Sequence, residues 1–354
     1  MSRKTDHTLP DAVAAALSRL GPALATGHAP SEVVAEAIAG LADLPPKAVT
    51  WADAKIAELS QLDRRHEARP SLLTLFRRSH TALELLDRRP ELAPIFLFHR
   101  DGYVREAALD SLAVPPVSPF FLAAITLRLN DWVRPVRIAA RRCAERLLPD
   151  TAAEVVAGAA PFLLDRWRQW GRWEGEDASV VDRALQRQDV ADHLAEWFCE
   201  GATGPLATLL RYALRGPSLD GHLPRLASDA LQPAVRAVAL HALIDGRVSW
   251  PVGFGREWID KQYGHWKRIT LFAHRNIVHG LAPDMLIGEG LRDRSSAVRR
   301  VAADALIERR AMFPNLDVAV AALAMDASPA LRARADFIVR DQARQSALKL
   351  PPGL

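Results

Sequence analysis

The sequence has little cysteine and no long apolar run, and each shortage excludes a class of protein. Only Cys143 and Cys199 occur in 354 residues, and both lie in helix-like apolar segments. A disulfide-stabilised secreted protein needs more cysteines, so we expect a reducing, cytoplasmic location. The first apolar segment is soon interrupted by Ser18 and Arg19, and no run approaches the ~18 residues that cross a bilayer. We therefore expect no signal peptide, no membrane span and no membrane partner.

Common catalytic and cofactor motifs are also missing. The Gly253–Gly255 segment lacks the third glycine and the preceding strand of a dinucleotide fingerprint, and no Gly-Lys-Ser/Thr phosphate loop or Gly-x-Ser-x-Gly elbow occurs. His274 and His279 are five residues apart, the wrong spacing for two ligands on one helical face. His193 and Cys199 have no further ligands nearby. We expect no catalytic residue, no cofactor and no metal.

Lysine is scarce, with six residues against 40 arginines, and the charge is unevenly distributed. The net charge is +1 over residues 1–100, −4 over 101–200 and +7 over 201–354. This asymmetry points to an anionic partner for the C-terminal half.

One motif recurs along the chain. Val-Arg or Leu-Arg is followed, three residues after the arginine, by alanine. Successive motif arginines are 32, 99, 63 and 33 residues apart, which is about one, three, two and one units of 32–33 residues. A constant period of this length is typical of stacked helical repeats. The motif arginines are Arg105, Arg137, Arg236, Arg299 and Arg332.

Each repeat can be explained by helix chemistry. An aspartate ends the turn before the second helix, Ser or Pro begins that helix, and the aliphatic residue enters the core. The motif alanine lies one turn further on, where it permits close helix approach. No segment shows sustained alternation of polar and apolar residues, so we expect an all-α protein without significant β-sheet. The turn aspartates are Asp101, Asp131, Asp229, Asp293 and Asp326.

This pattern resembles the HEAT-repeat family in its short bacterial form, clearly over 98–148 and 225–345. The resemblance implies a right-handed α-solenoid of about nine or ten helix pairs. It also implies that each motif arginine pairs with a turn aspartate of its own or a neighbouring repeat. The expected organisation is a flexible tail (1–10) and one solenoid (11–346), then a C-terminal tail (347–354). Within the solenoid, 11–98 is atypical and 149–224 is irregular and contains tryptophans.

The period also predicts degenerate repeats in the gaps. Steps from Arg137 reach 169–170 and 202–203, and a step from Arg236 reaches residue 268. Residues 266–273 around Arg268 have the composition of a helix, so we expect a helix there.

Partner-binding candidates are the arginines outside the motif and a tryptophan cluster in the C-terminal half. Their alternative roles are a solvated helix face for the arginines and core packing for the aromatic residues. The candidates are Arg268, Arg275, Arg292, Arg294, Arg300, Arg309, Arg310, Trp250, Trp258 and Trp266.

A second cluster has tryptophans followed by acids. Its spacing suits core packing, or else an aromatic cleft that stacks on a base. HEAT-like alkylpurine DNA glycosylases use tryptophans and one carboxylate, and the likeness to them is at the level of the fold. The residues of this alternative are Trp167, Trp170, Trp173, Glu174, Glu176 and Asp177.

The sequence thus predicts a non-catalytic scaffold or adaptor that binds a macromolecule, with protein as the first expectation, on the concave face of a solenoid. Two alternatives stand beside it: a nucleic-acid binder acting through the basic C-terminal half, and the glycosylase. Neither the oligomeric state nor the partner's identity follows from the residues.

Overall fold

The structure, a computed structural model, describes residues 8–27, 29–62, 82–166, 170, 172 and 176–349. The described chain is mostly helical and contains one small sheet of two strands. It divides into two compact units, Met1–Val190 and Ala191–Leu354.

The first unit consists of short helices packed on their neighbours in sequence. Helices α5 and α6 pack together, as do α7 and α8, and then α9 and α10. Contacts also join α6 to α8 and α8 to α10, so corresponding helices of successive pairs lie side by side. The elements are α1 (Asp11–Ala25), α2 (Ser31–Ala42), η1 (Pro46–Ala48), α3 (Val49–Leu59), α4 (Ala82–Arg88), η2 (Pro90–Leu92), α5 (Ala93–Phe96), α6 (Gly102–Ser111), α7 (Pro119–Arg128), α8 (Arg134–Leu147), α9 (Ala153–Arg166) and α10 (Glu176–Leu185).

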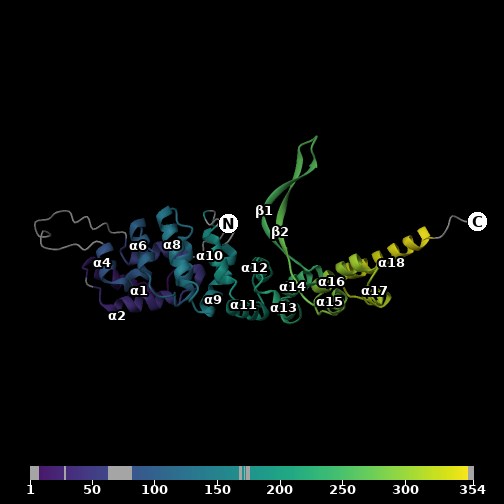
Figure 1. Cartoon of the computed structure of the whole chain (residues 1–354), viewed down its shortest axis with the longest axis horizontal. Helices are drawn as coiled ribbons and strands as arrows, with labels where there is room; N and C mark the ends of the chain where they lie inside the picture. The colour runs from purple at the N-terminus through teal and green to yellow at the C-terminus, as the bar shows by residue number, and fades with distance from the viewer. Residues whose placement is uncertain are drawn as a thin grey trace, which may run out of the picture. The chain divides into compact units, whose positions relative to one another are not determined.

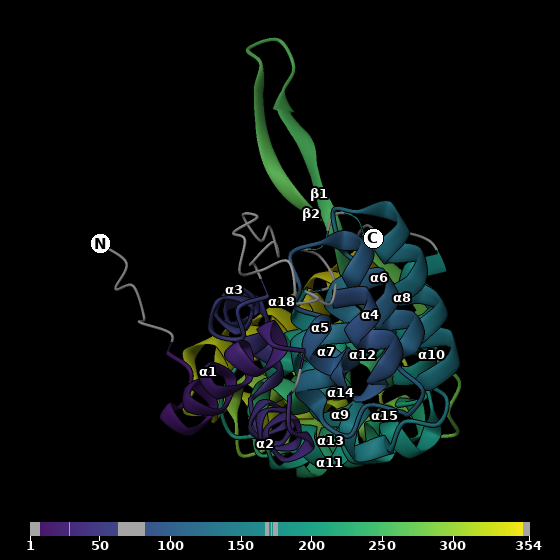
Figure 2. The same ribbon diagram turned by 90° about the vertical axis from the view of Figure 1, so that its left-hand side faces the viewer.

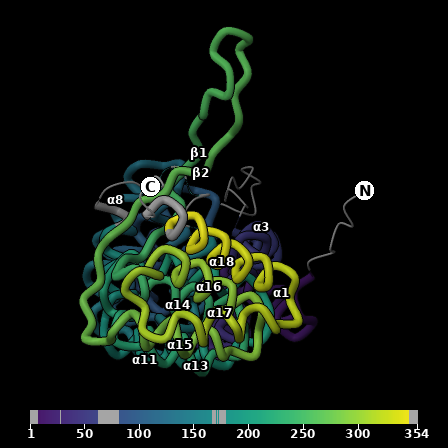
Figure 3. Tube along the Cα trace, turned by 90° about the vertical axis from the view of Figure 1, so that its right-hand side faces the viewer, coloured from purple at the N-terminus to yellow at the C-terminus, as the bar shows by residue number. Residues whose placement is uncertain are grey.

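The second unit repeats this arrangement and adds the sheet. Helices α14, α16 and α18 contact one another in succession, and α13, α15 and α17 pack beside them (Figure 3). The elements are α11 (Gln188–Glu200, which spans the unit boundary), α12 (Leu206–Ala213), η3 (Asp220–His222), α13 (Leu223–Asp229), α14 (Pro233–Asp245), β1 (Arg247–Asp260), β2 (His265–Asn276), α15 (Pro283–Gly290), α16 (Ser296–Arg309), α17 (Leu316–Ala324) and α18 (Pro329–Lys349).

The repeated motif forms the core of each helix pair. All five motif alanines are buried: Ala108, Ala140, Ala239, Ala302 and Ala335. The aliphatic residue before each motif arginine is buried as well. A methyl group at these positions lets the neighbouring helix approach closely, while the aliphatic side chains fill the space between helices.

The expectation of no significant sheet was wrong, and so was the helix expected at 266–273. Residues 247–276 form a β-hairpin of about 40 Å, given the length of its strands. Most of its side chains are exposed, so no buried face imposes the polar–apolar alternation that reveals a strand in a sequence. In Figures 1 and 2 the green hairpin stands away from the helices at its base.

Helix α1 is the first described helix and α18 is the last. Residues 8–10 precede helix α1, which begins at Asp11, and residues 1–7 lie outside the described part, so the flexible tail expected over residues 1–10 stays a prediction. Helix α18 continues to Lys349, three residues beyond the expected end of the array at 346.

Candidate partner-binding hairpin

The base of the hairpin is fixed to the second unit. Gly246 ends α14 in the left-handed conformation (φ 61°), and its carbonyl accepts a hydrogen bond from the Ile277 amide. Val248 is buried where β1 contacts α12 and α14. Arg275 on β2 forms an ion pair with both oxygens of Asp220, at 2.5 and 2.8 Å. The strands therefore leave the helices from a fixed position.

Beyond its base the hairpin is held by backbone pairing between its two strands and by contacts within the hairpin itself. The strands pair from Arg247 with Asn276 to Asp260 with His265, with irregularities after Pro251 and after Trp258. The Asp260 carboxylate accepts hydrogen bonds from the backbone amides of Gln262 and Tyr263, at 2.8 and 3.2 Å. Gly264, in the same turn, has a positive φ of 68°. We call residues 252–271 the arm.

One face of the arm gathers arginines and aromatic rings. In an antiparallel pair, directly opposed residues share a face and alternate residues along a strand do too. Phe254 is opposite Thr270, and the next two pairs on that face are Arg256 with Arg268 and Trp258 with Trp266. Phe254, Arg256, Trp258, Trp266 and Arg268 therefore make up what we call the arginine–aromatic face.

The rings of this face are open to solvent. Phe254 is 50% exposed, Trp258 49% and Trp266 44%. The Arg268 guanidinium lies 3.6 Å from the centroid of the Phe254 ring, and that of Arg256 lies 4.6 Å from the Trp266 ring. Each contact is diagonal across the strands, as the register requires. Exposed apolar side chains gathered on one element mark an interaction surface.

The two arginines of the face are electrostatically uncompensated. They are directly opposed across the strands, and like charges in this arrangement destabilise the pairing. Neither forms an ion pair with a carboxylate among the described residues. The cation–π contacts, worth about 0.5–1 kcal/mol at exposed sites, offset this repulsion without neutralising the charge.

The opposite face of the arm is different in character. Lys267 pairs with Glu257 at 2.9 Å, so its charge is balanced. Leu271 and Ile269 lie over Gly255, where an added Cβ would approach Leu271 to 3.1 Å. Over the whole hairpin six lysines and arginines stand against two acids, a net charge of +4. The excess charge of the arm is thus concentrated on the arginine–aromatic face.

The candidate residues predicted from the sequence divide into two groups. Trp258, Trp266 and Arg268 come together on the arginine–aromatic face, while Trp250 is half-buried lower on β1. Arg256 was missed, because only the strand register places it opposite Arg268. Its proximity to Trp258 in sequence is the only signal that could have found it.

The other candidate arginines lie on or beside the helices, and several serve the fold. Besides its pair with Asp220, Arg275 donates to the Gly216 carbonyl. Arg309 donates to the Ile244 carbonyl, and Arg310 pairs with Asp341 at 2.6 Å. The guanidinium groups of these three residues are engaged within the second unit, and partner binding by them stays a prediction. Arg292, Arg294 and Arg300 are exposed.

The motif arginines form a regular set of contacts, which we call the arginine–aspartate ladder. Arg105 pairs with Asp131, and Arg299 pairs with Asp326, each through two hydrogen bonds of 2.7–3.0 Å. Arg236 pairs with Asp293 at 2.8 and 2.9 Å. Every motif arginine also donates to the carbonyl six residues before it, and this contact is shared by Arg105, Arg137, Arg236, Arg299 and Arg332.

Each ladder aspartate holds the start of the following helix as well. Asp131, Asp293 and Asp326 accept the amide two residues ahead, at 2.6–2.9 Å. Burial by itself would raise the pKa of Asp131 and of Asp293, but the hydrogen bonds from arginine and amide and the arginine charges lower it below the ordinary value. For Asp326 the hydrogen bond from Arg299 is the main cause of a lowered pKa.

Asp229 does not belong to the ladder. It is the last residue of α13, is exposed, and forms no ion pair with the described residues. A motif arginine that could pair with Asp229 would lie one period before Arg236. The chain has no motif arginine there, and Gly204 occupies that region with a positive φ of 86°.

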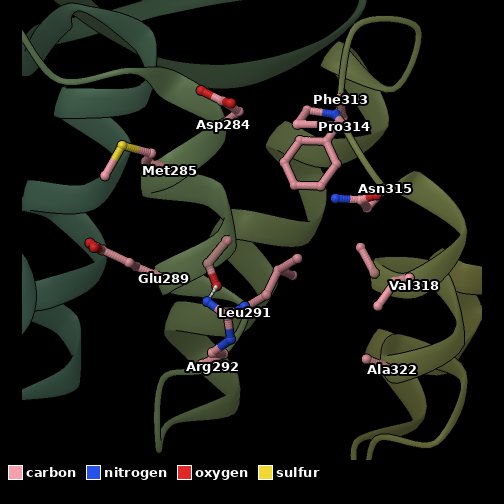
Figure 4. A pocket seen from close by; sticks show the side chains of 12 residues that line it. Asp284, Met285, Glu289, Leu291, Arg292, Phe313, Pro314, Asn315, Val318 and Ala322 are labelled. Carbon is pink, nitrogen blue, oxygen red and sulfur yellow. Dashed lines mark hydrogen bonds between the residues drawn. The ribbon is translucent and has the colours of Figure 1, made fainter.

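A groove of about 540 Å³ lies between α15 and α17 (Figure 4). Met285 and Val318 line it from the two helices, with Phe313 at one end, and Arg292 donates to the Gly288 carbonyl at its wall. Asp284 and Glu289 are its acids. No nucleophile stands with a base among the groove's lining residues, so it presents no catalytic arrangement.

Most side chains of the glycosylase alternative lie outside the part of the chain that the structure describes. Trp167, Trp173 and Glu174 lie outside the described residues, as do the side chains of Glu176 and Asp177 in α10. Trp170 is buried and packs edge-on against Phe162 at 5.8 Å. It contributes to the core of the first unit rather than to an open cleft.

Within the described ranges, no group of three His, Cys, Asp or Glu side chains is placed to hold a metal ion. No helix of the part described has the length and apolar composition that would span a bilayer. Comparison with protein-family models, curated proteins and solved structures finds no match to this chain.

Proposed function

We propose that this chain is a non-catalytic nucleic-acid-binding protein whose hairpin arm contacts the partner. The observation that carries the proposal is the arginine–aromatic face, with exposed rings and two unneutralised, opposed guanidinium groups on one surface. Lys261 in the turn and Arg247 at the base are further cations without an ion pair among the described residues. Cations interleaved with aromatic rings are the combination that binds phosphates and bases together.

The helices serve, in this proposal, as HEAT-like repeats that hold the arm. The arginine–aspartate ladder, the buried motif alanines and the successive contacts of α14, α16 and α18 support this assignment. A continuous right-handed solenoid over both units is part of the same proposal. A protein partner on its concave face, the first expectation from the sequence, stays a prediction. The uncompensated charge of the arm is what favours nucleic acid.

The arm is an insertion between two repeats in this scheme. Arg236 and Arg299 are 63 residues apart, which had suggested two repeat units. Removal of the 30 residues of the hairpin, Arg247–Asn276, leaves 33, the interval that also separates Arg299 from Arg332. One of the repeats counted from the sequence is therefore the hairpin.

A shortened variant tests the proposal. Residues 252–271 are replaced by Asn-Gly, which joins the opposed residues Pro251 and Phe272 by a two-residue hairpin turn. Fluorescence anisotropy with labelled oligonucleotides would then compare the full chain and the shortened chain. With four unpaired cations engaged, we expect log K to fall with log salt with a slope of about −3 for the full chain, over about 50 to 200 mM.

The control carries Arg294→Gln with Arg300→Gln, two exposed arginines of the second unit that lie outside the hairpin. We expect the control to bind like the full chain and the shortened chain to lose binding. Equal binding by the full and shortened chains would remove the arm from the proposal, and absence of binding by the full chain would refute it.

A further inference from the structure

We infer that the arm recognises single-stranded nucleic acid, with unpaired bases stacked on the rings of the arginine–aromatic face and backbone phosphates held by Arg256 and Arg268. This inference rests on the proposed function and specifies the state of the partner. DNA and RNA single strands share the chemistry involved, so the experiment includes both.

The rings determine the strand state. Phe254, Trp258 and Trp266 lie on one face and expose about half of their surface. A ring plane gains stacking energy from the face of a base, and base faces are accessible only where the strand is unpaired. A duplex offers base edges in its grooves, which are read by hydrogen-bonding groups. The hydrogen-bonding side chains of the arginine–aromatic face are Arg256, Arg268 and Thr270, and both arginines lie against rings of the same face.

The arginine pair supplies the backbone contact. Arg256 and Arg268 are directly opposed across the strands, and each guanidinium lies against a ring of the same face. Because Arg256 reaches toward the turn and Arg268 toward the hairpin base, phosphate oxygens along a strand would receive charge-assisted hydrogen bonds from each guanidinium separately. Neighbouring nucleobases would then stack on the Trp258 and Trp266 rings near the turn and on the Phe254 ring nearer the helices.

The distribution of polarity along the arm disfavours a membrane. An arm that inserts into lipid has its apolar residues at the tip, whereas the turn here reads Asp260-Lys261-Gln262-Tyr263-Gly264-His265. The large apolar side chains of the arm lie along the strands instead. Their alternation with arginine matches a partner that alternates flat apolar groups with negative charges, as a nucleotide chain does.

The experiment measures anisotropy with labelled oligonucleotides of about 16 nucleotides, as single-stranded DNA, single-stranded RNA and the corresponding DNA duplex. Vesicles containing anionic phospholipid are the fourth partner tested, and co-sedimentation measures binding to them. The full chain is used throughout. We expect single-stranded DNA and single-stranded RNA each to bind at least tenfold more tightly than the DNA duplex. We expect no co-sedimentation with the vesicles.

Two double variants test the face. Arg256→Gln with Arg268→Gln removes two charges from the arginine–aromatic face, while Lys261→Gln with Lys267→Gln removes two from the turn and the opposite face. We expect the first to halve the salt slope and the second to reduce it less. Trp266→Ala should weaken binding by about 5- to 150-fold, the usual effect of losing one stacked base. Ile269→Ala, on the opposite face, is its control. Circular dichroism verifies that each variant keeps its helices.

The outcomes separate the two proposals. Equal affinity for duplex and single strands would overturn this inference and leave the proposed function standing. Equal losses of affinity in the two double variants would overturn this inference as well, since the arginine–aromatic face would then have no special role. Binding to vesicles without binding to any oligonucleotide would overturn both. Preference for single strands that depends on Arg256, Arg268 and Trp266 would support both.

Discussion

Arg236 and Asp293 form a two-hydrogen-bond ion pair across 57 residues of sequence, about twice the separation of the other ladder pairs. Arg105 is 26 residues from Asp131, and Arg299 is 27 from Asp326. The extra length between Arg236 and Asp293 is the 30-residue hairpin. The ladder thus continues across the hairpin, and α14 packs on both α15 and α16.

This pair should be important for stability. The Arg236 side chain is 1% exposed, so Asp293→Asn leaves a buried cation without its carboxylate. We expect a loss of about 3 kcal/mol in the free energy of unfolding, near the lower end for a broken buried pair. Urea denaturation followed by circular dichroism measures it. Asp229→Asn is the matched control, expected to change stability by less than about 0.5 kcal/mol. Similar losses in both variants would contradict the role given to the ladder.

Acid should weaken the ladder in a defined range of pH. The pKa of Asp131 is lowered in the folded state, so its contribution is present above the unfolded value of about 3.9 and is lost as pH falls through the folded pKa. We expect the stability difference between the wild type and Asp131→Asn to be constant from about pH 7 to 5 and to shrink below about pH 4. Unfolding measured across this range checks it. A difference that stays constant at acid pH would show that ionised Asp131 does not stabilise the fold.

The helix pairs could be predicted from the sequence because buried packing constrains residue types. Close helix approach requires the small motif alanines, and the arginine at a fixed distance from the preceding turn reaches that turn's carbonyl. The hairpin escaped prediction because its 30 residues nearly equal one repeat. A step of one period from Arg236 therefore fell on Arg268 and gave a false repeat. Both strands are exposed on both faces, so burial imposed no pattern that could have corrected the error.

The candidate site was found only in part for the same reason. Trp258, Trp266 and Arg268 were found from residue type alone, as part of a tryptophan cluster and as an arginine outside the motif. Which of them share a face depends on the strand register and on the irregularities after Pro251 and Trp258, and neither is visible in composition. Arg275 was grouped with them although Asp220, which binds it, is 55 residues earlier.

Gly290 should not tolerate a side chain. A Cβ there would lie 2.6 Å from Leu240 on α14 and 2.9 Å from Ala302 on α16, so α15 would have to move from its neighbours. We expect Gly290→Ala to cost about 1–3 kcal/mol of unfolding free energy, as overpacking does. Gly288→Ala, two residues earlier, meets only the flexible end of Arg292 at 3.9 Å. It should be neutral or stabilise by up to about 1 kcal/mol, through the higher helix propensity of alanine. Equal effects in a denaturation series would contradict the close packing of α15.

The arm should be dispensable for folding. The shortened chain keeps Val248 and the Arg275–Asp220 pair at the hairpin base and loses mainly exposed residues. We therefore expect an unchanged helical circular dichroism signal and a stability within about 1 kcal/mol of the full chain. Loss of cooperative unfolding in the shortened chain would mean that the arm belongs to the core of the second unit.

Ultraviolet cross-linking to a single-stranded oligonucleotide, followed by mass spectrometry of the digested protein, most directly tests whether the arm is the nucleic-acid-binding element. Cross-links form where bases contact side chains, and aromatic residues are efficient partners. We predict cross-linked peptides from residues 252–271, with Trp258, Trp266 or Phe254 as the modified positions. Cross-links confined to α15–α18, with none in the arm, would contradict the proposed function of the hairpin.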